Sequence, residues 1–200
     1  MDNRVRLVSG RWIAVALLAV GLACLVWVGA EVANEAAFQR RQARTLDRLT
    51  DTRASTPAPS IARPAVGEPI GTLEIARVGL SAVVAEGDDD ATLDKAVGHL
   101  PDTVLPWEDG NSALAGHRDT FFRPLKDVRV GDEVRLATPH GTFAYRVTEA
   151  FVTTPDDVGV LSPRGKAELT LVTCYPFNYI GSAPKRYIVR AEREALHSPD

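Results

Sequence analysis

Residues 131–147 have the sequence GDEVRLATPHGTFAYRV, in which apolar and polar positions alternate on both sides of a central turn. Before the turn, Val134 and Leu136 alternate with charged residues, and after it Phe143 and Tyr145 alternate with small or polar ones. A period of two predicts strands with one buried face, because successive side chains of a strand point to opposite faces. The Pro-His-Gly sequence between the halves predicts a tight turn, so this stretch indicates a β-hairpin.

Similar strand patterns continue on both sides of the hairpin. Upstream, Leu73 and Ile75 alternate with polar residues, and the short apolar runs 112–115 and 169–172 have the length of interior strands. Leu93, Ala96 and Val97, which come after the potential capping residues Asp88–Asp90, fit one short helix. So many short strands predict an all-β domain, a closed barrel or a sandwich, with one or two short helices.

Composition limits the function classes. The chain has 200 residues, which leaves room for one domain after an anchor and a linker. Its net charge is −3 and its basic residues form no stripe, so nucleic acid is not an expected partner. Its two cysteines, Cys24 and Cys174, cannot build a disulfide framework. The aspartates at 88–90 lack the spaced oxygen ligands of a calcium site, so a helix cap is expected there. No cofactor or metal is predicted.

The N-terminal region predicts a membrane anchor. Residues 12–30 carry no charge, and at ~1.5 Å rise per residue they match the thickness of a bilayer core. Three arginines precede this run and two glutamates follow it, so residues 1–11 are expected in the cytoplasm and the remainder outside the cell membrane. A cleaved signal peptide is the alternative, because Ala30 and Ala33 could mimic a cleavage site.

The segment after the anchor predicts a spacer, residues 31–69. Its first part has the composition of a solvated helical stalk, and residues 54–69 contain four prolines and favour an extended linker. The catalytic domain is therefore expected at 70–192, followed by a tail at 193–200.

Cys174 is a candidate nucleophile. It ends the run Glu168–Cys174 directly before Tyr175 and a proline that should stop the strand. A free cysteine in an exported domain is either buried and inert or retained for reactivity. Because a thiol with a pKa of ~8.5 is mostly protonated near neutrality, a nucleophilic cysteine needs a base or a cation nearby.

The histidines differ in their surroundings. His140 lies in the predicted turn, His197 in the tail, and His99 after the predicted helix, where capping or packing would explain it. His117 ends an apolar strand between a glycine and charged residues, which suits a polar active site. Position alone leaves open whether His117 is functional.

Three motifs together resemble the sortase family. They are AGHRDTFF at 115–122, TLVTC at 170–174 and KRYIVRA at 185–191. The resemblance implies an eight-stranded β-barrel and a cysteine transpeptidase with Cys174 as nucleophile, His117 as acid and base, and Arg186 as oxyanion stabiliser. It also implies an exported substrate with a C-terminal sorting signal of the Leu-Pro-x-Thr-Gly type and an amine acceptor, either a cell-wall precursor or a pilin lysine.

The sequence YPFNYIG at 175–181 looks most like class D sortases. Pilus-building members carry an N-terminal lid with an acidic-aromatic anchor, and residues 54–69 contain neither an Asp nor an aromatic residue, so an open site is expected. Two arginines, Arg186 and Arg190, share one face of the last predicted strand. The connection between the last two strands suits an antiparallel return, which favours Arg186.

Two other functions remain as alternatives. A cysteine peptidase would use the same three residues but hydrolyse the acyl-enzyme with water. A membrane-anchored barrel that binds peptides without catalysis would make Cys174 incidental.

Overall fold

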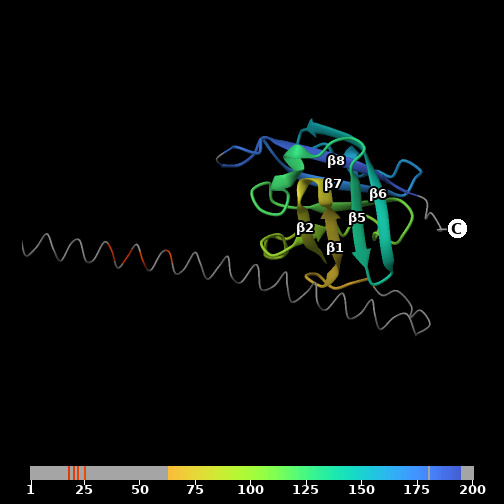
Figure 1. Cartoon of the computed structure of the whole chain (residues 1–200), viewed down its shortest axis with the longest axis horizontal. Helices are drawn as coiled ribbons and strands as arrows, with labels where there is room; N and C mark the ends of the chain where they lie inside the picture. The colour runs from red at the N-terminus through yellow and green to blue at the C-terminus, as the bar shows by residue number, and fades with distance from the viewer. Residues whose placement is uncertain are drawn as a thin grey trace, which may run out of the picture. The chain divides into compact units, whose positions relative to one another are not determined.

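A computed structural model describes residues 63–179 and 181–194, together with positions 18, 20, 22 and 25. From residue 63 onward the described chain forms a β-barrel (Figure 1). Its strands are β1 (Pro69–Ile75), β2 (Leu80–Glu86), β3 (Val97–His99), β4 (Asn111–Ala115), β5 (Glu133–Thr138), β6 (Gly141–Thr153), β7 (Glu168–Tyr175) and β8 (Lys185–Arg193). The helices are α2 (Asp90–Leu93) and the 3-10 helices η1 (Ala76–Val78), η2 (Arg123–Asp127) and η3 (Val158–Leu161).

The sheet closes on itself in the order β1-β2-β3-β4-β7-β8-β6-β5, with β5 paired to β1. Only the pairs β2–β3 and β4–β7 are parallel among these described strands. The sequence left a barrel and a sandwich open, and the resemblance implied eight strands. The closed eight-stranded barrel with short helices confirms the implied fold.

The stretch 131–147 forms the β5–β6 hairpin as predicted. Leu136 is opposite Phe143 and Val134 is opposite Tyr145 in the register of the two strands. The turn needs Gly141, which has φ of +126°, a backbone conformation that residues with a Cβ rarely adopt. Alternation therefore placed the buried faces of both strands correctly.

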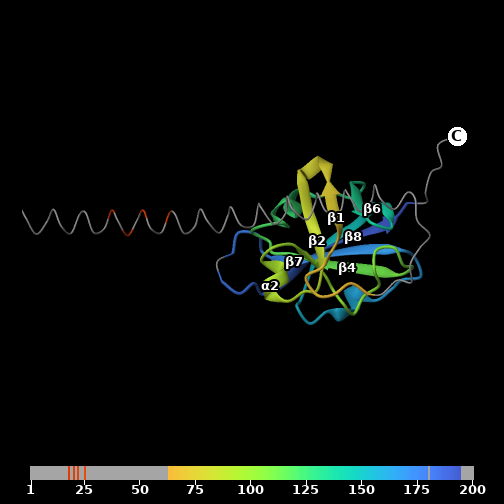
Figure 2. The same cartoon turned by 90° about the horizontal axis from the view of Figure 1, so that it is seen from below.

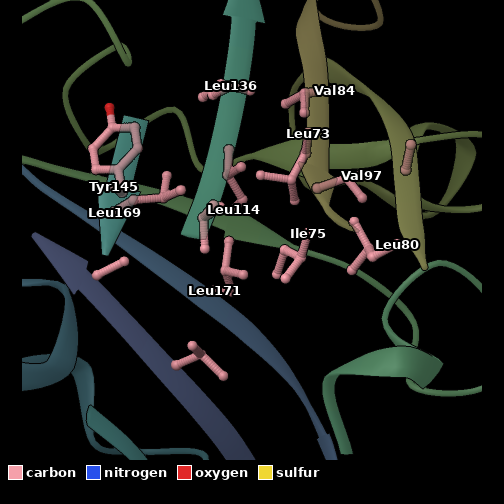
Figure 3. Packing of buried hydrophobic residues seen from close by; sticks show 14 of the residues in the cluster. Leu73, Ile75, Leu80, Val84, Val97, Leu114, Leu136, Tyr145, Leu169 and Leu171 are labelled. Atoms are coloured by element: carbon pink, nitrogen blue, oxygen red, sulfur yellow. The ribbon is translucent and has the colours of Figure 1, made fainter. Parts of the chain in front are cut away.

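The core lies inside the barrel. Side chains from β1, β4, β5 and β7, including Leu73, Leu114, Leu136 and Leu171, point toward one another with no exposed surface (Figure 3). Burial of each such side chain contributes roughly 1.5–3 kcal/mol. Tyr145 is also fully buried, and its hydroxyl donates to the carbonyl of Pro106 at 3.1 Å.

The short helix predicted after Asp88–Asp90 to include Leu93, Ala96 and Val97 ends earlier than expected. Asp89 caps α2 by accepting from the Thr92 amide, which confirms the helix-cap prediction, but α2 ends at Leu93. Val97 instead begins β3 and pairs with Val84 of β2. Pairing between segments distant in sequence therefore overrides the local helical pattern.

His99 consequently lies in a strand, and the prediction that it follows a helix is wrong. Its side chain is fully buried, with Nδ1 2.7 Å from Glu86 Oε2 and Nε2 3.0 Å from the Val104 carbonyl. Packing within the barrel accounts for this histidine.

The predicted anchor, stalk and most of the linker lie outside the described residues. Of residues 12–30 only positions 18, 20, 22 and 25 are described, and they are helical. Within the described part of the chain, no helix has the length and apolar character needed to cross a membrane.

Candidate active site

The candidate nucleophile lies on the outer face of the barrel. Along β7, Leu169 and Leu171 point into the core with no exposed surface, so alternation turns Val172 and Cys174 outward. Cys174 is half-buried and forms no disulfide. β7 ends one residue later at Tyr175, in agreement with the stop predicted from Pro176.

Arg186 lies directly beside Cys174 on the neighbouring strand. β7 and β8 pair antiparallel, and in their register Cys174 is opposite Arg186 whereas Arg190 is opposite Thr170. The antiparallel return predicted from the connection is therefore confirmed. At ~3.3 Å per residue, Arg190 lies about 13 Å further along β8, too far to share a small reacting group with Cys174.

His117 follows β4, which flanks β7 on its other side. The parallel register pairs Ala115 with Val172, and β4 ends there, so His117 follows β4 at the same end of the barrel as Cys174. The Gly116 amide donates to the Val172 carbonyl at 3.2 Å, which completes the last pair of the ladder. His117 after β4, Cys174 near the end of β7 and Arg186 near the start of β8 lie at one end of the barrel and are called here the Cys174 row.

Gly116 is needed where β4 leaves the barrel. A Cβ at this position would lie 2.9 Å from Cδ2 of Phe122, a fully buried ring, so no larger residue fits without moving the core. The hydroxyl of Thr173 donates to the Gly116 carbonyl at 2.7 Å and fixes the same peptide from the other side. The backbone that carries His117 is thus held rigidly against β7.

The His117 imidazole is partly open to solvent. Its Nε2 is 3.6 Å from Oδ1 of Asp94, the residue that follows α2, and the two side chains are 39% and 70% exposed. A pair this exposed adds little stability. The His117 imidazole therefore stays accessible to a substrate.

Arg186 presents an unpaired cation next to Cys174. Its Nη1 donates to the Lys185 carbonyl at 3.2 Å, and no carboxylate of the described chain lies within ion-pair distance of it. Because a guanidinium carries five N–H donors, several remain available for an oxygen anion formed near Cys174.

Sequence reasoning did not assign a role to Arg118. Its Nη2 donates to the carbonyls of Tyr179 and Gly181, at 2.7 and 3.0 Å. These bonds attach the connection between β7 and β8 to the residue that follows His117. That connection leaves the barrel at the end where α2 lies (Figure 2). No pattern in the sequence indicates this role of Arg118, because its partners are backbone carbonyls, which every residue carries.

Aromatic side chains close the inside of the barrel at this end. The rings of Phe177 and Tyr187 meet edge to face with centroids 5.3 Å apart, and Tyr175 stacks on Tyr187 at 6.2 Å. Burial raises the pKa of Tyr187 above its ordinary value. The Cys174 row therefore lies on a rigid apolar support.

A second row lies next to the Cys174 row on the outer face. The registers align Ala115, Val172, Ile188 and Phe151 across β4, β7, β8 and β6. We call these four residues the apolar row. Ala115 and Val172 are half-buried, so part of the apolar row is accessible.

The other histidines lie elsewhere. His140 packs against Trp107 with ring centroids 4.0 Å apart and ring planes tilted by 31°. It lies in the turn at the opposite end of β6 from Thr153, the residue paired with Arg186. His99 is inside the barrel. Among the described histidines, only His117 follows the strand that flanks β7 at the Cys174 end.

Residues 73–194 match the family model described as the sortase domain. The chain belongs to the sortase family. This sortase is 40% identical over 132 residues to Sortase D of Bacillus subtilis, an alignment covering 66% of this chain and 67% of that protein.

Solved structures agree with this assignment. A Clostridium perfringens Sortase D5 transpeptidase superposes with a TM-score of 0.65 at 28% identity, covering 80% of this chain and 98% of that one. Sortase E from Streptomyces avermitilis gives a TM-score of 0.56 at 34% identity, covering 66% and 91%. The family predicted from the three motifs, with its likeness to class D, is confirmed. Since sortases are cysteine transpeptidases, the protein is an enzyme of that type.

Proposed function

We propose that this sortase cleaves a Leu-Pro-x-Thr-Gly-like sorting signal of exported proteins at the threonine carbonyl and transfers the acyl group to an amine. The observation that carries the proposal is the Cys174 row, in which Cys174 is opposite Arg186, a guanidinium without an ion pair in the described chain, and His117 follows the strand on the other side of β7. A nucleophile, an acid-base group and an anion stabiliser are what acyl transfer requires.

In the first half-reaction the Cys174 thiolate attacks the threonine carbonyl carbon and forms the C–S bond. The carbonyl electrons move to oxygen, where Arg186 stabilises the negative charge without exchanging a proton. When the carbonyl re-forms, the C–N bond breaks, and the His117 imidazolium gives its proton to the leaving amine. The product is a thioester on Cys174.

In the second half-reaction an amine attacks the thioester carbonyl. Neutral His117 takes the proton that the amine loses, and the Cys174 thiolate leaves as the new amide forms. Water in place of the amine would give hydrolysis by the same residues. Transfer is favoured over hydrolysis here because the family is one of transpeptidases.

The surface beside Cys174 supports a peptide substrate with apolar residues before the threonine. The apolar row begins two residues from Cys174 and His117, and a side chain preceding the scissile bond would meet Val172 and Ala115. Burial of one such side chain would contribute on the order of 1.5–3 kcal/mol.

We further propose that the domain works outside the cell membrane, anchored by residues 12–30 with its N-terminus in the cytoplasm, on an open site without a lid. The supporting observation is the uncharged run with arginines before it and glutamates after it. Intact protein should stay in the membrane fraction at high salt, with residues beyond 31 accessible to protease only from outside. Release of a soluble form beginning near Ala30 would indicate cleavage instead.

The reaction is tested by incubating the protein with a Leu-Pro-x-Thr-Gly peptide, with and without an added amine. The proposal expects a ligated product that increases with the amine. A free carboxylate product at every amine concentration would assign a peptidase. Neither product, together with slow alkylation of Cys174 by a thiol probe, would assign a binding module.

A further inference from the structure

Two side chains from the barrel wall hold the segment η3 on the outer face. The Val160 carbonyl accepts from Asn111 Nδ2 at 3.3 Å and from Arg190 Nη2 at 3.1 Å. Asn111 Nδ2 also donates to the Leu161 carbonyl at 3.0 Å. The connection between β6 and β7, residues 154–167, is thus attached to β4 and β8 at its centre.

The Asn111 amide is fixed by its own surroundings. Its residue is 3% exposed, and its Oδ1 accepts from the Thr170 hydroxyl at 2.8 Å. The Oδ1 acceptor of Asn111 is therefore occupied by the Thr170 hydroxyl, and its Nδ2 donors are occupied by the carbonyls of η3. If η3 moved away, the two carbonyls would lose these donors and Asn111 would keep only one partner, an arrangement that buried polar groups avoid.

Arg190 is held almost as firmly. Its side chain is 12% exposed, its guanidinium stands over the Phe151 ring at 5.4 Å, and its Nη1 is 3.6 Å from Glu149 Oε2. Glu149 in turn accepts from Arg164 at 2.8 Å, a hydrogen bond that lowers the pKa of its carboxyl. Arg164 belongs to the same connection as η3, so the segment is attached at two points.

We propose that Asn111 and Arg190 are positioning residues that hold η3 beside the apolar row and so set the affinity for the peptide, without taking part in acyl transfer. In the register of β7 and β8, the pair Thr170 and Arg190 is the next outer-face pair beyond Val172 and Ile188 of the apolar row, on the side away from Cys174. η3 attached there borders the surface that an extended peptide would cover. The proposal rests on the proposed peptide substrate.

The binding step is where such residues should act. A preformed surface does not have to be ordered when the peptide arrives, whereas a loose segment would lose conformational entropy on binding. The Cys174 row lies on separate strand ends and does not depend on η3. Loosening η3 should therefore raise KM and leave kcat nearly unchanged.

The experiment compares wild type with Asn111→Asp and Arg190→Gln. Asn111→Asp keeps an acceptor for Thr170 but loses the donors to η3, and Arg190→Gln shortens a side chain that is already partly exposed. The control is Lys166→Gln, which removes an ion pair to Glu192 at the end of the same connection. The Lys166 and Glu192 side chains are 62% and 37% exposed, and this pair makes no bond to η3. Each is assayed with a Leu-Pro-x-Thr-Gly peptide and an amine.

Three readouts separate the possibilities. Amide hydrogen exchange over residues 156–163 should rise about tenfold in both test variants, as expected for the loss of one or two hydrogen bonds, and stay at the wild-type rate in the control. KM should rise about tenfold while kcat stays within twofold. The rate of Cys174 alkylation by iodoacetamide, a probe too small to need η3, should not change.

Unchanged exchange in Arg190→Gln would overturn the proposal even if Asn111→Asp failed to fold. A fall in kcat at constant KM, or slower alkylation, would assign these residues to the chemistry and also overturn it. If wild type does not process the peptide, the proposed substrate fails, and hydrogen exchange still decides whether the two residues hold η3.

Discussion

The inner and outer faces of β7 and β8 differ although they belong to the same two strands. On the inner face Leu169, Leu171 and Val189 are fully buried in the core. On the outer face Cys174 and Arg186 are half-buried and face each other across the register. Side chains that point inward therefore stabilise the barrel, and their neighbours in the chain, which point outward, are placed for chemistry. Substitutions on the two faces should have separable effects.

The largest effect is expected from Cys174→Ala. Acyl transfer should be abolished because no other nucleophile occupies the Cys174 row, and the thermal unfolding midpoint should change little because the residue is outside the core. Product formation by chromatography and unfolding by circular dichroism measure the two. Substantial product from this variant would show that Cys174 is not the nucleophile.

His117→Ala should be nearly as damaging, because the leaving amine needs a proton to depart. Matched substitutions of His140 and His99 test the assignment. His140→Ala should keep near-wild-type turnover, and His99→Ala should act through stability, since the residue is buried beside Glu86. A greater loss of kcat in a folded His140 or His99 variant would make His117 the wrong acid.

Arg186→Ala should lower turnover by two or more orders of magnitude, as loss of an oxyanion donor does in other acyl transferases. Arg186→Lys should recover little, because the forked donor geometry is lost. Arg190→Ala should be mild in kcat, within a few-fold, with its effect on KM. The reverse ranking, on variants with equal melting behaviour, would move the oxyanion role to Arg190.

On the inner face, Leu171→Ala should lower the free energy of unfolding by about 2–5 kcal/mol, because it leaves a cavity in the core. Its kcat at a temperature where it remains folded should stay close to wild type. Chemical denaturation and initial-rate assays measure these quantities. Loss of kcat without loss of stability would contradict the separation of the two faces.

Much of the barrel and of the Cys174 row could be predicted because the information is local. The alternation of Val134 and Leu136 identified a strand and its buried face, and the three motifs brought Cys174, His117 and Arg186 to attention. Only the choice between Arg186 and Arg190 needed an argument about strand direction, and the connection length correctly predicted the antiparallel pairing that places Arg186 opposite Cys174.

The remainder depends on contacts between distant segments. β3 has three residues, too few for alternation to appear. Because β3 pairs with β2, Val97 lies in a strand and not in the helix that its local sequence predicted. Arg118 and Asn111 donate to backbone carbonyls 61 and 50 residues away, and a carbonyl acceptor is present in every residue type. Their roles have no counterpart in the sequence pattern.

The central claim is that Cys174 carries the acyl group between donor and amine. Mass spectrometry of the intact protein, mixed with a Leu-Pro-x-Thr-Gly peptide and no amine, tests it directly. We predict an added mass equal to the peptide up to its threonine, located on Cys174 and discharged on addition of an amine with formation of the ligated peptide. Ligated product formed without any adduct on Cys174, or an adduct on another residue, would contradict the account.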